Sequence, residues 1–292
     1  MAIHEPVMVA EVLSHLEPAR GGLFVDCTVG LGGHARALLD AGASRLIGLD
    51  RDPEALRMAG EALAPYGDRV DLVHSDYRAL AQVLDARAAA APQGVLADLG
   101  VSSMQLDAPG RGFSFRRDEP LDMRMDTTAG PTAAEAIAGA DEQQLADVIY
   151  EFGEERHARR VARAIVAARQ DAPIETTGRL ADVVRRAIPR KGFARIDPAT
   201  RTFQAIRIWV NHELDGLDAF LGDALARLDR GGRLVVITFH SLEDRIVKHT
   251  LRAQQSAGLA AVRTKRPQVP AQAEIDRNPR ARSAKLRSAE RL

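Results

Sequence analysis

The chain contains the stretch Phe24-Val25-Asp26-Cys27-Thr28-Val29-Gly30-Leu31-Gly32-Gly33-His34, which continues through an alanine-rich segment, residues 35–41, to Leu46-Ile47-Gly48-Leu49-Asp50. A short apolar run that enters a glycine loop, a helical segment and a second apolar run that ends on an acid predict a β-loop-α-β unit. The glycines let the backbone turn sharply and approach a ligand, and a carboxylate ending the second strand can accept both hydroxyls of a ribose. The stretch therefore predicts a site for a nucleoside-containing cofactor.

The glycine spacing alone does not say which cofactor binds. Gly30-x-Gly32-x-x-Ala35 also satisfies the dinucleotide fingerprint, so NAD and S-adenosylmethionine both fit it. Asp26 stands at the end of the first strand, where it would repel a pyrophosphate but attract the cationic sulfonium and ammonium of S-adenosylmethionine. Asp26 therefore favours S-adenosylmethionine, while the alternative that it only caps the loop stays open.

Length and composition indicate a globular protein. With 292 residues and 46% hydrophobic content the chain can bury a large core, as one large domain or one domain with an insertion. The single cysteine, Cys27, excludes an intramolecular disulfide framework and a multi-cysteine metal site, and no metal-ligand spacing is evident. Residues 1–6 lack the pattern of a signal peptide, and no apolar run approaches the roughly 18 residues of a membrane span. We therefore expect a cytoplasmic protein without a membrane segment.

The charge distribution is asymmetric although the net charge is zero. Residues 245–292 hold twelve Lys or Arg and three Asp or Glu, so this segment carries +9 and the rest of the chain −9. Such asymmetry is typical of proteins with an anionic partner. We expect Arg280, Arg282, Lys285 and Arg287 to contact phosphates.

Three predicted strands end on an acid. They end at Asp26, at Asp50 and, after the apolar run 94–99, at Asp98. In an open parallel sheet the carboxyl ends of the strands form the ligand-binding edge. A further strand, 70–74, is followed by Tyr77, whose ring either lies against an adenine or is an ordinary aromatic at the start of the helix 78–90.

The middle of the chain changes pattern. Residues 100–125 lack periodicity but are rich in Phe, Leu and Met, which predicts a folded loop. Residues 132–188 show helical periodicity with no strand, which indicates a helical insertion. Its arginines, at 156, 159, 160 and 163, form either a contact surface or an ordinary solvated face. The loop 190–195, which couples positive charge to Phe193 beside a glycine, is the better contact candidate.

The sheet resumes after two predicted helices, 199–214 and 217–228. The strand 233–239 is followed at once by His240-Ser241-Leu242-Glu243-Asp244, in which Ser241 and Asp244 fit a capping box. His240 stands at a strand's carboxyl end, facing the expected cleft. A structural and a functional role for His240 both stay open.

These stretches together closely resemble the bacterial 16S ribosomal RNA cytosine N4-methyltransferases, the RsmH (formerly MraW) family. The resemblance spans nearly the whole chain in order, and two residues depart from the family pattern: Met104 replaces a proline and Glu119 a glycine. The motifs that carry it are His4-x-Pro6-Val7, Asp26-x-Thr28-x-Gly30-x-Gly32-Gly33-His34, Asp50-Arg51-Asp52-Pro53, Asp98-Leu99-Gly100-Val101-Ser102-Ser103, Arg111-Gly112-Phe113-Ser114-Phe115, Leu121-Asp122-Met123-Arg124-Met125, Gly153-Glu154-Glu155-Arg156, Arg201-x-Phe203-Gln204, Phe239-His240-Ser241-Leu242-Glu243-Asp244-Arg245 and Asn278-Pro279-Arg280.

The resemblance implies a class I (Rossmann-like) α/β methyltransferase fold. Residues 1–105 and 200–292 would form the discontinuous methyltransferase domain, and 106–199 a helical substrate-recognition insertion. The implied reaction is transfer of a methyl group from S-adenosylmethionine to the N4 amine of the cytidine at position 1402, in the usual numbering, of 16S rRNA in the small ribosomal subunit. The implied cofactor contacts are Gly32, Gly33, His34, Asp50, Tyr77, Asp98 and Gln105.

The reaction places demands on the acceptor side of the site. The cytosine amine is a poor nucleophile, so hydrogen-bond acceptors on its N–H groups would assist attack and take up the departing proton. Asp98, the Leu99 carbonyl and Ser102 are the candidates. The base must also leave its stack, and Phe113, Phe115 and Phe193 are possible stacking partners, with core packing as the alternative.

Two other functions remain to be weighed against this one. The glycine spacing also suits an NAD-dependent oxidoreductase, and a noncatalytic RNA-binding or ribosome-assembly protein could retain a nucleoside pocket. The sequence leaves open whether the substrate is naked RNA or an assembled small subunit. It also leaves open the oligomeric state, a homodimer being one option.

Overall fold

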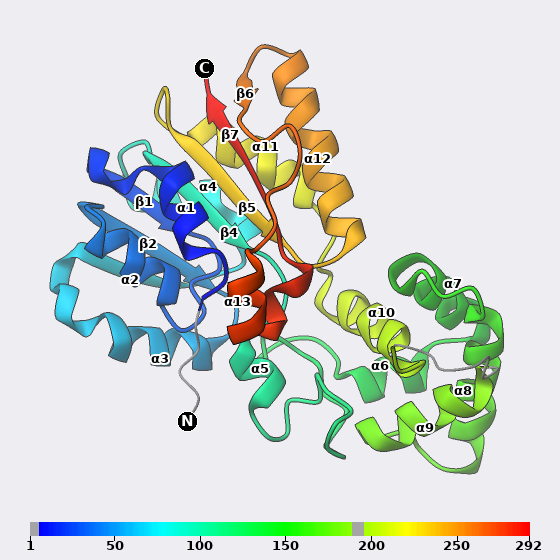
Figure 1. The fold of residues 1–292 in the computed structure, drawn as a ribbon. Coiled ribbons are helices and arrows are strands. Elements are labelled where there is room, and N and C mark those ends of the chain that lie inside the picture. Colours follow the sequence, from blue (N-terminus) through cyan, green and yellow to red (C-terminus); the bar gives the residue numbers. More distant parts are fainter. Residues whose placement is uncertain (1–5, 189–195) are drawn as a thin grey trace. The chain divides into compact units, whose positions relative to one another are not determined.

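The computed structural model describes residues 6–188 and 196–292 (Figure 1). These residues form two compact units, each with its own apolar core. The first unit comprises Met1–Gly100 and Leu214–Leu292, and the second comprises Val101–Glu213. No helix of the described residues is long and apolar enough to span a membrane.

The first unit is built on a seven-stranded sheet of order β3-β2-β1-β4-β5-β7-β6. Strands β1 to β5 are parallel, whereas β7 runs antiparallel to both β5 and β6. The strand order reverses between β1 and β4, and this switch point is where ligands bind in open α/β sheets. The strands are β1 (Leu23–Asp26), β2 (Arg45–Asp50), β3 (Val70–His74), β4 (Gly94–Asp98), β5 (Arg233–Thr238), β6 (Ala260–Val262) and β7 (Lys285–Arg291).

Helices cover both faces of this sheet (Figure 1). Successive strand residues point to opposite faces, so Val25 joins one apolar cluster and Phe24 the other. One cluster includes side chains of α4, α11 and α12, and the other includes side chains of α1, α2 and α3. The helices are α1 (Val9–Leu16), α2 (Gly33–Asp40), α3 (Pro53–Leu63), α4 (Leu80–Ala86), α11 (Leu217–Arg227), α12 (Ser241–Ser256) and α13 (Gln272–Arg277).

Strands β6 and β7 have no counterpart among the elements expected from the sequence. Their segment is rich in Arg and Lys, which hid the short apolar pattern of Leu286 and Ala289. In the structure β7 pairs with the whole length of β5, from Thr238 opposite Lys285 to Arg233 opposite Glu290. The basic segment is therefore partly an interior strand and not a free tail.

The second unit is helical, as expected for the insertion, and the described residues place α7 against α8 and α10. The aperiodic segment 100–125 is folded, as predicted, although it contains the short helix α5. The buried Asn211 side chain accepts a hydrogen bond from Met125 N and donates one to the Met123 carbonyl, both 2.7 Å long. The helices are α5 (Ser103–Asp107), α6 (Ala133–Gly139), α7 (Glu142–Gly153), α8 (Ala158–Asp171), α9 (Thr177–Ala187) and α10 (Ala199–Asn211).

The second unit is wider than the expected insertion, 106–199. Helix α10 belongs to it because Ala199, Phe203 and Ile206 are buried in the same apolar cluster as the neighbouring helices. That this unit recognises the substrate stays a prediction.

Candidate functional site

The carboxyl edge of the sheet carries three acids at the switch point and beside it. Strands β1, β2 and β4 end at Asp26, Asp50 and Asp98, as the sequence predicted. Asp26 pairs in register with Gly48 of β2 and Leu96 of β4, so β1 lies between the two other acid-ended strands. All three acids belong to the first unit, and their surroundings decide what this edge can bind.

The glycine loop is held close to the second of these acids. Gly32 caps α2 in the left-handed region, with φ of 82°, which favours glycine. A Cβ on Gly33 would lie only 2.9 Å from Pro6 Cγ, so the close approach of the N-terminal segment requires a glycine there. The Gly30 backbone N–H donates to Asp50 Oδ2 at 2.8 Å, which fixes the loop against β2.

Asp50 keeps acceptor capacity toward a ligand. Its Oδ1 accepts from Asp52 N at 2.9 Å and its Oδ2 from Gly30 N. Burial raises the pKa of Asp50 to about 6, although these backbone N–H groups favour the charged form. A carboxylate offers about four lone-pair sites, so Asp50 keeps acceptor capacity for the ribose that the sequence assigned to it.

Asp26 is the most buried of the three acids, with no exposed surface. Its Oδ1 accepts from Thr28 N at 3.2 Å, so part of the loop-capping role is real. Its Oδ2 has no hydrogen-bond partner among residues 6–188 and 196–292. Burial raises the pKa of Asp26 to about 7, and the charge of Asp50 adds to this rise. A buried carboxylate oxygen without a donor is costly, so Asp26 needs either a proton or a cation.

Asp98, at the end of β4, has an environment similar to that of Asp26. Its Oδ1 is buried without a hydrogen-bond partner in the described part of the chain, and its backbone N–H donates to Thr28 Oγ1 at 2.7 Å. Burial raises the pKa of Asp98 well above its ordinary value, helped by the charges of Asp26 and Glu243. Two neighbouring strands therefore each present a carboxylate oxygen that the described residues do not satisfy.

The His34 side chain lies between the N-terminal segment and Asp98. Its Nε2 is 2.8 Å from the Val7 carbonyl, which can only accept, so Nε2 carries a proton. Its Nδ1 lies on the other side of the ring, 3.7 Å from Asp98 Oδ2. The structure thus brings His34 and Asp98, two of the predicted site residues, together.

Tyr77 starts a short 3₁₀ turn, η3 (Tyr77–Ala79), after β3. Its buried ring packs against Phe220 with 4.7 Å between the ring centroids. The turn is capped by Asp76, whose Oδ1 accepts from Arg78 N at 2.9 Å. The structure thus gives the ring a core-packing role, and its contact with an adenine stays a prediction.

Ser102 and Gln105 belong to the second unit, where they cap each other. Ser102 Oγ accepts from Gln105 N at 3.2 Å, and Gln105 Oε1 accepts from Ser102 N at 3.0 Å. This capping box starts α5. Both predicted site residues therefore have a structural role, which the spacing Ser-x-x-Gln could have revealed.

The capping box predicted for Ser241 and Asp244 is wrong by one residue. Helix α12 begins one position earlier than expected, so His240 is the N-cap and Glu243 the third helical residue. Glu243 Oε2 accepts from Phe239 N at 2.9 Å and from His240 N at 3.3 Å. In return His240 Nδ1 accepts from Glu243 N at 3.4 Å. His240 therefore has a structural role at the end of β5.

Asp244 is not part of that capping box and instead pairs with basic residues of β7, two of which were expected to contact phosphates. The Arg287 guanidinium donates to Asp244 Oδ1 at 2.6 Å, and Lys285 Nζ lies 3.5 Å from Asp244 Oδ2. Arg287 is only 5% exposed. The structure thus contradicts Arg287 as a phosphate contact and gives Lys285 an acidic partner, whereas Arg280 and Arg282 are exposed.

The aromatic residues predicted to stack on the target base pack against other residues of the protein. Phe113 is buried, and the Phe115 ring packs edge-on against Phe203 with 4.8 Å between centroids. Both belong to the core of the second unit. The predicted contact loop 190–195, with Phe193, and residue His4 of the quoted motifs lie outside the described residues.

Comparison with known proteins decides the family. The model of the MraW methylase family matches residues 1–292, the whole chain. The chain belongs to the MraW methylase family. This membership confirms the resemblance seen in the sequence and, with the strand order, the class I methyltransferase fold. It makes the chain a methyltransferase and leaves no support for the NAD-dependent oxidoreductase.

Relatives of this MraW family chain carry a consistent name. A "Ribosomal RNA small subunit methyltransferase H" of Bradyrhizobium diazoefficiens is 51% identical, covering 99% of this chain and 92% of the relative. A protein of the same name from Nitrobacter winogradskyi is 52% identical, covering 99% of this chain and 90% of the relative. Among solved structures, an rRNA methylase from Streptococcus thermophilus aligns with a TM-score of 0.43 at 13% identity, covering 96% of this chain and 95% of that one.

Proposed function

We propose that this protein transfers a methyl group from S-adenosylmethionine to the N4 amine of a cytidine in 16S rRNA. S-adenosylmethionine is the methyl donor of the MraW methylase family. The small-subunit RNA is the substrate in the names of the relatives, and the N4 amine follows from the family resemblance. The observation that carries the proposal is the pair of unpartnered carboxylate oxygens, Asp26 Oδ2 and Asp98 Oδ1, at the switch point.

The residues of this edge fit a cationic nucleoside. A buried carboxylate gains most from a cation, because Coulomb attraction is strong in a site with little water. S-adenosylmethionine carries a sulfonium and an ammonium, whereas a pyrophosphate would add negative charge beside Asp26, Asp50 and Asp98. We assign the cationic groups to Asp26 and Asp98 and the ribose hydroxyls to Asp50. Gly32, Gly33, His34, Tyr77 and Gln105 are the further cofactor contacts of the proposal.

Asp98 is the group that we assign to the reacting amine. When bound, S-adenosylmethionine supplies a methyl group activated by the positive sulfur. A hydrogen bond from the cytosine N–H to Asp98 draws electron density onto N4, and the carboxylate can then take up the departing proton. The nearby His34 Nδ1 offers that proton a second acceptor. Ser102 and the Leu99 carbonyl remain the other acceptors of the proposal.

Rigid placement of these groups is the main contribution expected of the protein. Asp98 is fixed at the end of β4 by its backbone bond to Thr28, and Leu99 N donates to the Ile237 carbonyl at 2.9 Å. Holding reactants in a productive geometry can supply roughly 7–11 kcal/mol of barrier reduction. The strand ends are suited to this because the parallel sheet holds them on both sides.

The test is methyl transfer by the purified protein. It is incubated with methyl-labelled S-adenosylmethionine and with either naked 16S rRNA or assembled small subunits that lack the modification, and mass spectrometry locates the label. We expect one N4-methylcytidine, and loss of transfer in Asp98→Asn even when S-adenosylmethionine is saturating. A protein that binds S-adenosylmethionine but methylates neither substrate would instead be a noncatalytic assembly factor. Near wild-type turnover by Asp98→Asn would exclude its acceptor role.

A further inference from the structure

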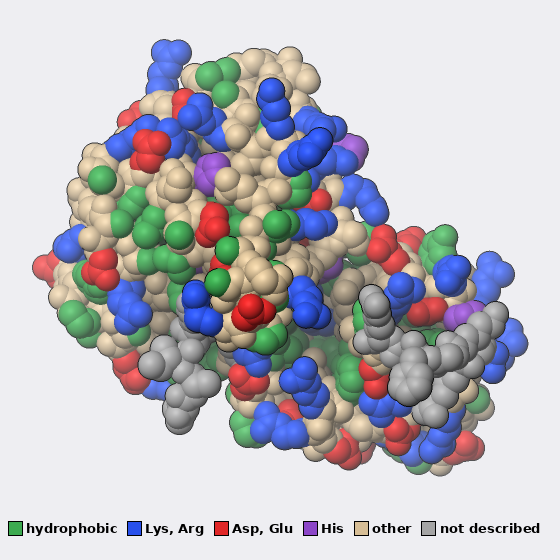
Figure 2. Space-filling view, viewed as in Figure 1, with side chains coloured by type: hydrophobic (Ala, Val, Ile, Leu, Met, Phe, Trp, Pro, Cys, Tyr) green, Lys and Arg blue, Asp and Glu red, His purple; other side chains and the backbone are tan. Residues whose placement is uncertain are grey.

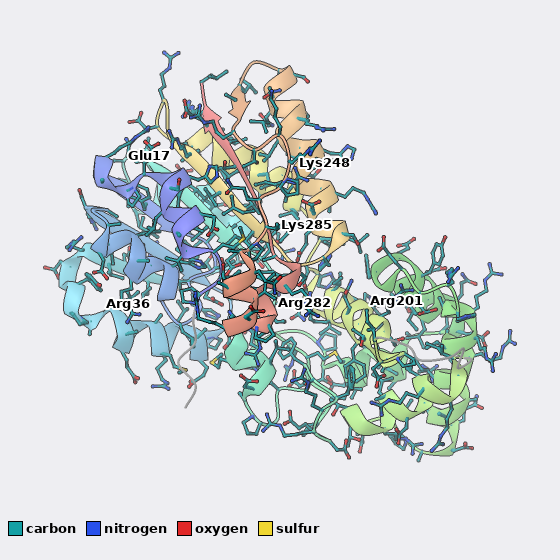
Figure 3. All side chains as sticks on the ribbon, in the orientation of Figure 1. Glu17, Arg36, Arg201, Lys248, Arg282 and Lys285 are labelled. Atoms are coloured by element: carbon teal, nitrogen blue, oxygen red, sulfur yellow. The ribbon has the colours of Figure 1, made fainter. Side chains whose placement is uncertain are left out.

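Helix α12 of the first unit presents a basic outer face. No Asp or Glu occurs in the sequence from Arg245 to Ala273. Val247 and Leu251 bury the inner side of the helix in the sheet's apolar core. The outer side carries the partly exposed Lys248 and the exposed His249 and Arg252, which lie on adjacent turns. Lys248 projects from α12 in Figure 3, and Figure 2 shows basic side chains gathered over this part of the unit.

Two further cations follow strand β6, which packs against α12. They are Lys265 and Arg266, and both are exposed. We call Lys248, His249, Arg252, Lys265 and Arg266 the α12 basic face.

The charges of the α12 basic face differ from the buried cations of this unit. Arg287 is paired with Asp244, and Arg233 with Glu17 and Glu290. Among the described residues, by contrast, no side chain pairs with any member of the α12 basic face. Like charges one turn apart on a helix repel and destabilise it slightly. An anionic partner would remove this repulsion.

We propose that the α12 basic face docks the phosphate backbone of RNA outside the target nucleotide. This rests on the proposed function for the identity of the RNA. Helix α12 starts directly after β5, at the sheet edge that holds Asp98 on the neighbouring β4. Its 16 residues extend about 24 Å from that edge. RNA bound along it would therefore be held at nucleotides that flank the reacting base, without sequence readout.

The composition of the face favours RNA over a membrane surface. A helix that binds a bilayer needs an apolar side that enters the lipid. The apolar side of α12 is already buried against the sheet, through Val247 and Leu251. The charged side chains of this surface are all Lys or Arg, and these suit phosphate oxygens.

The test compares two charge-reversed variants of the full-length protein. Lys248→Glu/Arg252→Glu alters the α12 basic face. Arg45→Glu/Arg230→Glu makes the same charge change at exposed positions at the amino ends of the strands, at the first residue of β2 and just before β5. Binding of a 16S rRNA fragment is measured between about 50 and 200 mM salt, with cofactor affinity and turnover at saturating RNA measured in parallel.

We expect the α12 variant to bind RNA on the order of tenfold more weakly than the control variant. Its plot of log affinity against log salt should be shallower by about 0.7–0.9 for each lost phosphate contact. Cofactor affinity and turnover at saturating RNA should stay within about twofold of wild type, because no residue of the face is assigned to the reaction.

Equal salt slopes and equal affinities of the two variants would overturn the proposal, as would α12-dependent binding to anionic phospholipid vesicles without α12-dependent binding to RNA. If charge reversal impairs folding, the variant Lys248→Gln/Arg252→Gln, which adds no acid, replaces it in the test. We expect the loss of RNA affinity in this variant to be about half that of Lys248→Glu/Arg252→Glu on a logarithmic scale. RNA binding that depends on α12 in a protein that methylates no rRNA would refute the proposed function and leave this docking surface standing.

Discussion

Asp26 shows most clearly how one buried residue links stability to ligand binding. Its carboxyl group has no exposed surface and one unpartnered oxygen, and its pKa is raised to about 7. The folded protein therefore binds a proton that the unfolded chain releases near the ordinary value of 3.8. Without ligand, stability should fall as pH rises between those two values.

The first prediction concerns Asp26→Asn. The amide removes the buried charge at nearly constant volume, so at pH 8 the free energy of unfolding should rise by about 1–4 kcal/mol relative to wild type, with little difference at pH 4. Cofactor affinity should fall at least on the order of tenfold because the cation loses its carboxylate. Urea unfolding at the two pH values measures the first effect, and calorimetric titration the second. Equal destabilisation of the variant at both pH values would mean that Asp26 is not a protonated, uncompensated acid.

The second prediction is that S-adenosylmethionine binding releases protons. A cation stabilises the carboxylate forms of Asp26 and Asp98, so binding at pH 6 should expel protons held there, and affinity should increase as pH rises through about 7. Calorimetric titration in two buffers with different ionisation enthalpies counts the protons. A binding enthalpy independent of the buffer would contradict the assignment of cationic groups to these acids.

At the scale of elements, a side chain in the first turn of α12 accepts hydrogen bonds from the backbone that follows β5 and so fixes the end of that strand. Glu243 accepts from two backbone N–H groups and is itself buried, and His240 caps the helix. This is a structural use of a histidine whose place at a strand's carboxyl end also suited catalysis. The sequence placed the cap one residue late because Ser241 and Asp244 fit the same pattern, and only the backbone geometry separates the two registers.

The third prediction tests the structural role of His240 as the N-cap of α12. His240→Ala should lower the free energy of unfolding by about 1–2 kcal/mol through loss of the N-cap, and His240→Asn, which retains an N-cap acceptor, should recover most of this loss. Chemical unfolding of both variants measures it. If Asn proves as destabilising as Ala, the capping account of His240 is wrong.

Strand β7 shows which features of the fold local sequence patterns could not predict. The acid-ended strands were predictable because an apolar run and its terminal acid are local signals, as in the run that ends at Asp98. The burial of Arg287 depends on Asp244, 43 residues away in sequence, and no local pattern shows that neutralisation. The sequence also could not show that one carboxylate oxygen of Asp26 lacks a hydrogen-bond donor among the described residues, because this depends on residues distant in sequence.

At the scale of the whole molecule, the chain divides into two compact units, each with its own buried apolar residues. The first unit holds the acids, the glycine loop and the α12 basic face, and the second holds the helices and the folded loop around Asn211. Family resemblance predicted this division, but its boundaries depend on which core buries α10, which a periodic pattern alone does not reveal.

The fourth prediction tests the independence of the second core. Asn211 is buried and bonds to the backbone of Met123, Met125 and Arg207. Asn211→Ala should leave these groups unsatisfied, at a cost of about 2–3 kcal/mol, and amide exchange should accelerate in α7 and α10 while β1 and β4 keep their protection. Uniform acceleration across both units would show that they unfold together.

The most direct test of the central claim is made on cellular rRNA. Mass spectrometry of 16S rRNA compares a strain that lacks this protein with the same strain carrying either the wild-type chain or Asp98→Asn. We predict that one N4-methyl group on one cytidine is absent from the deletion strain, returns with the wild-type chain and does not return with Asp98→Asn. An unchanged cytidine methylation pattern in the deletion strain would contradict the account.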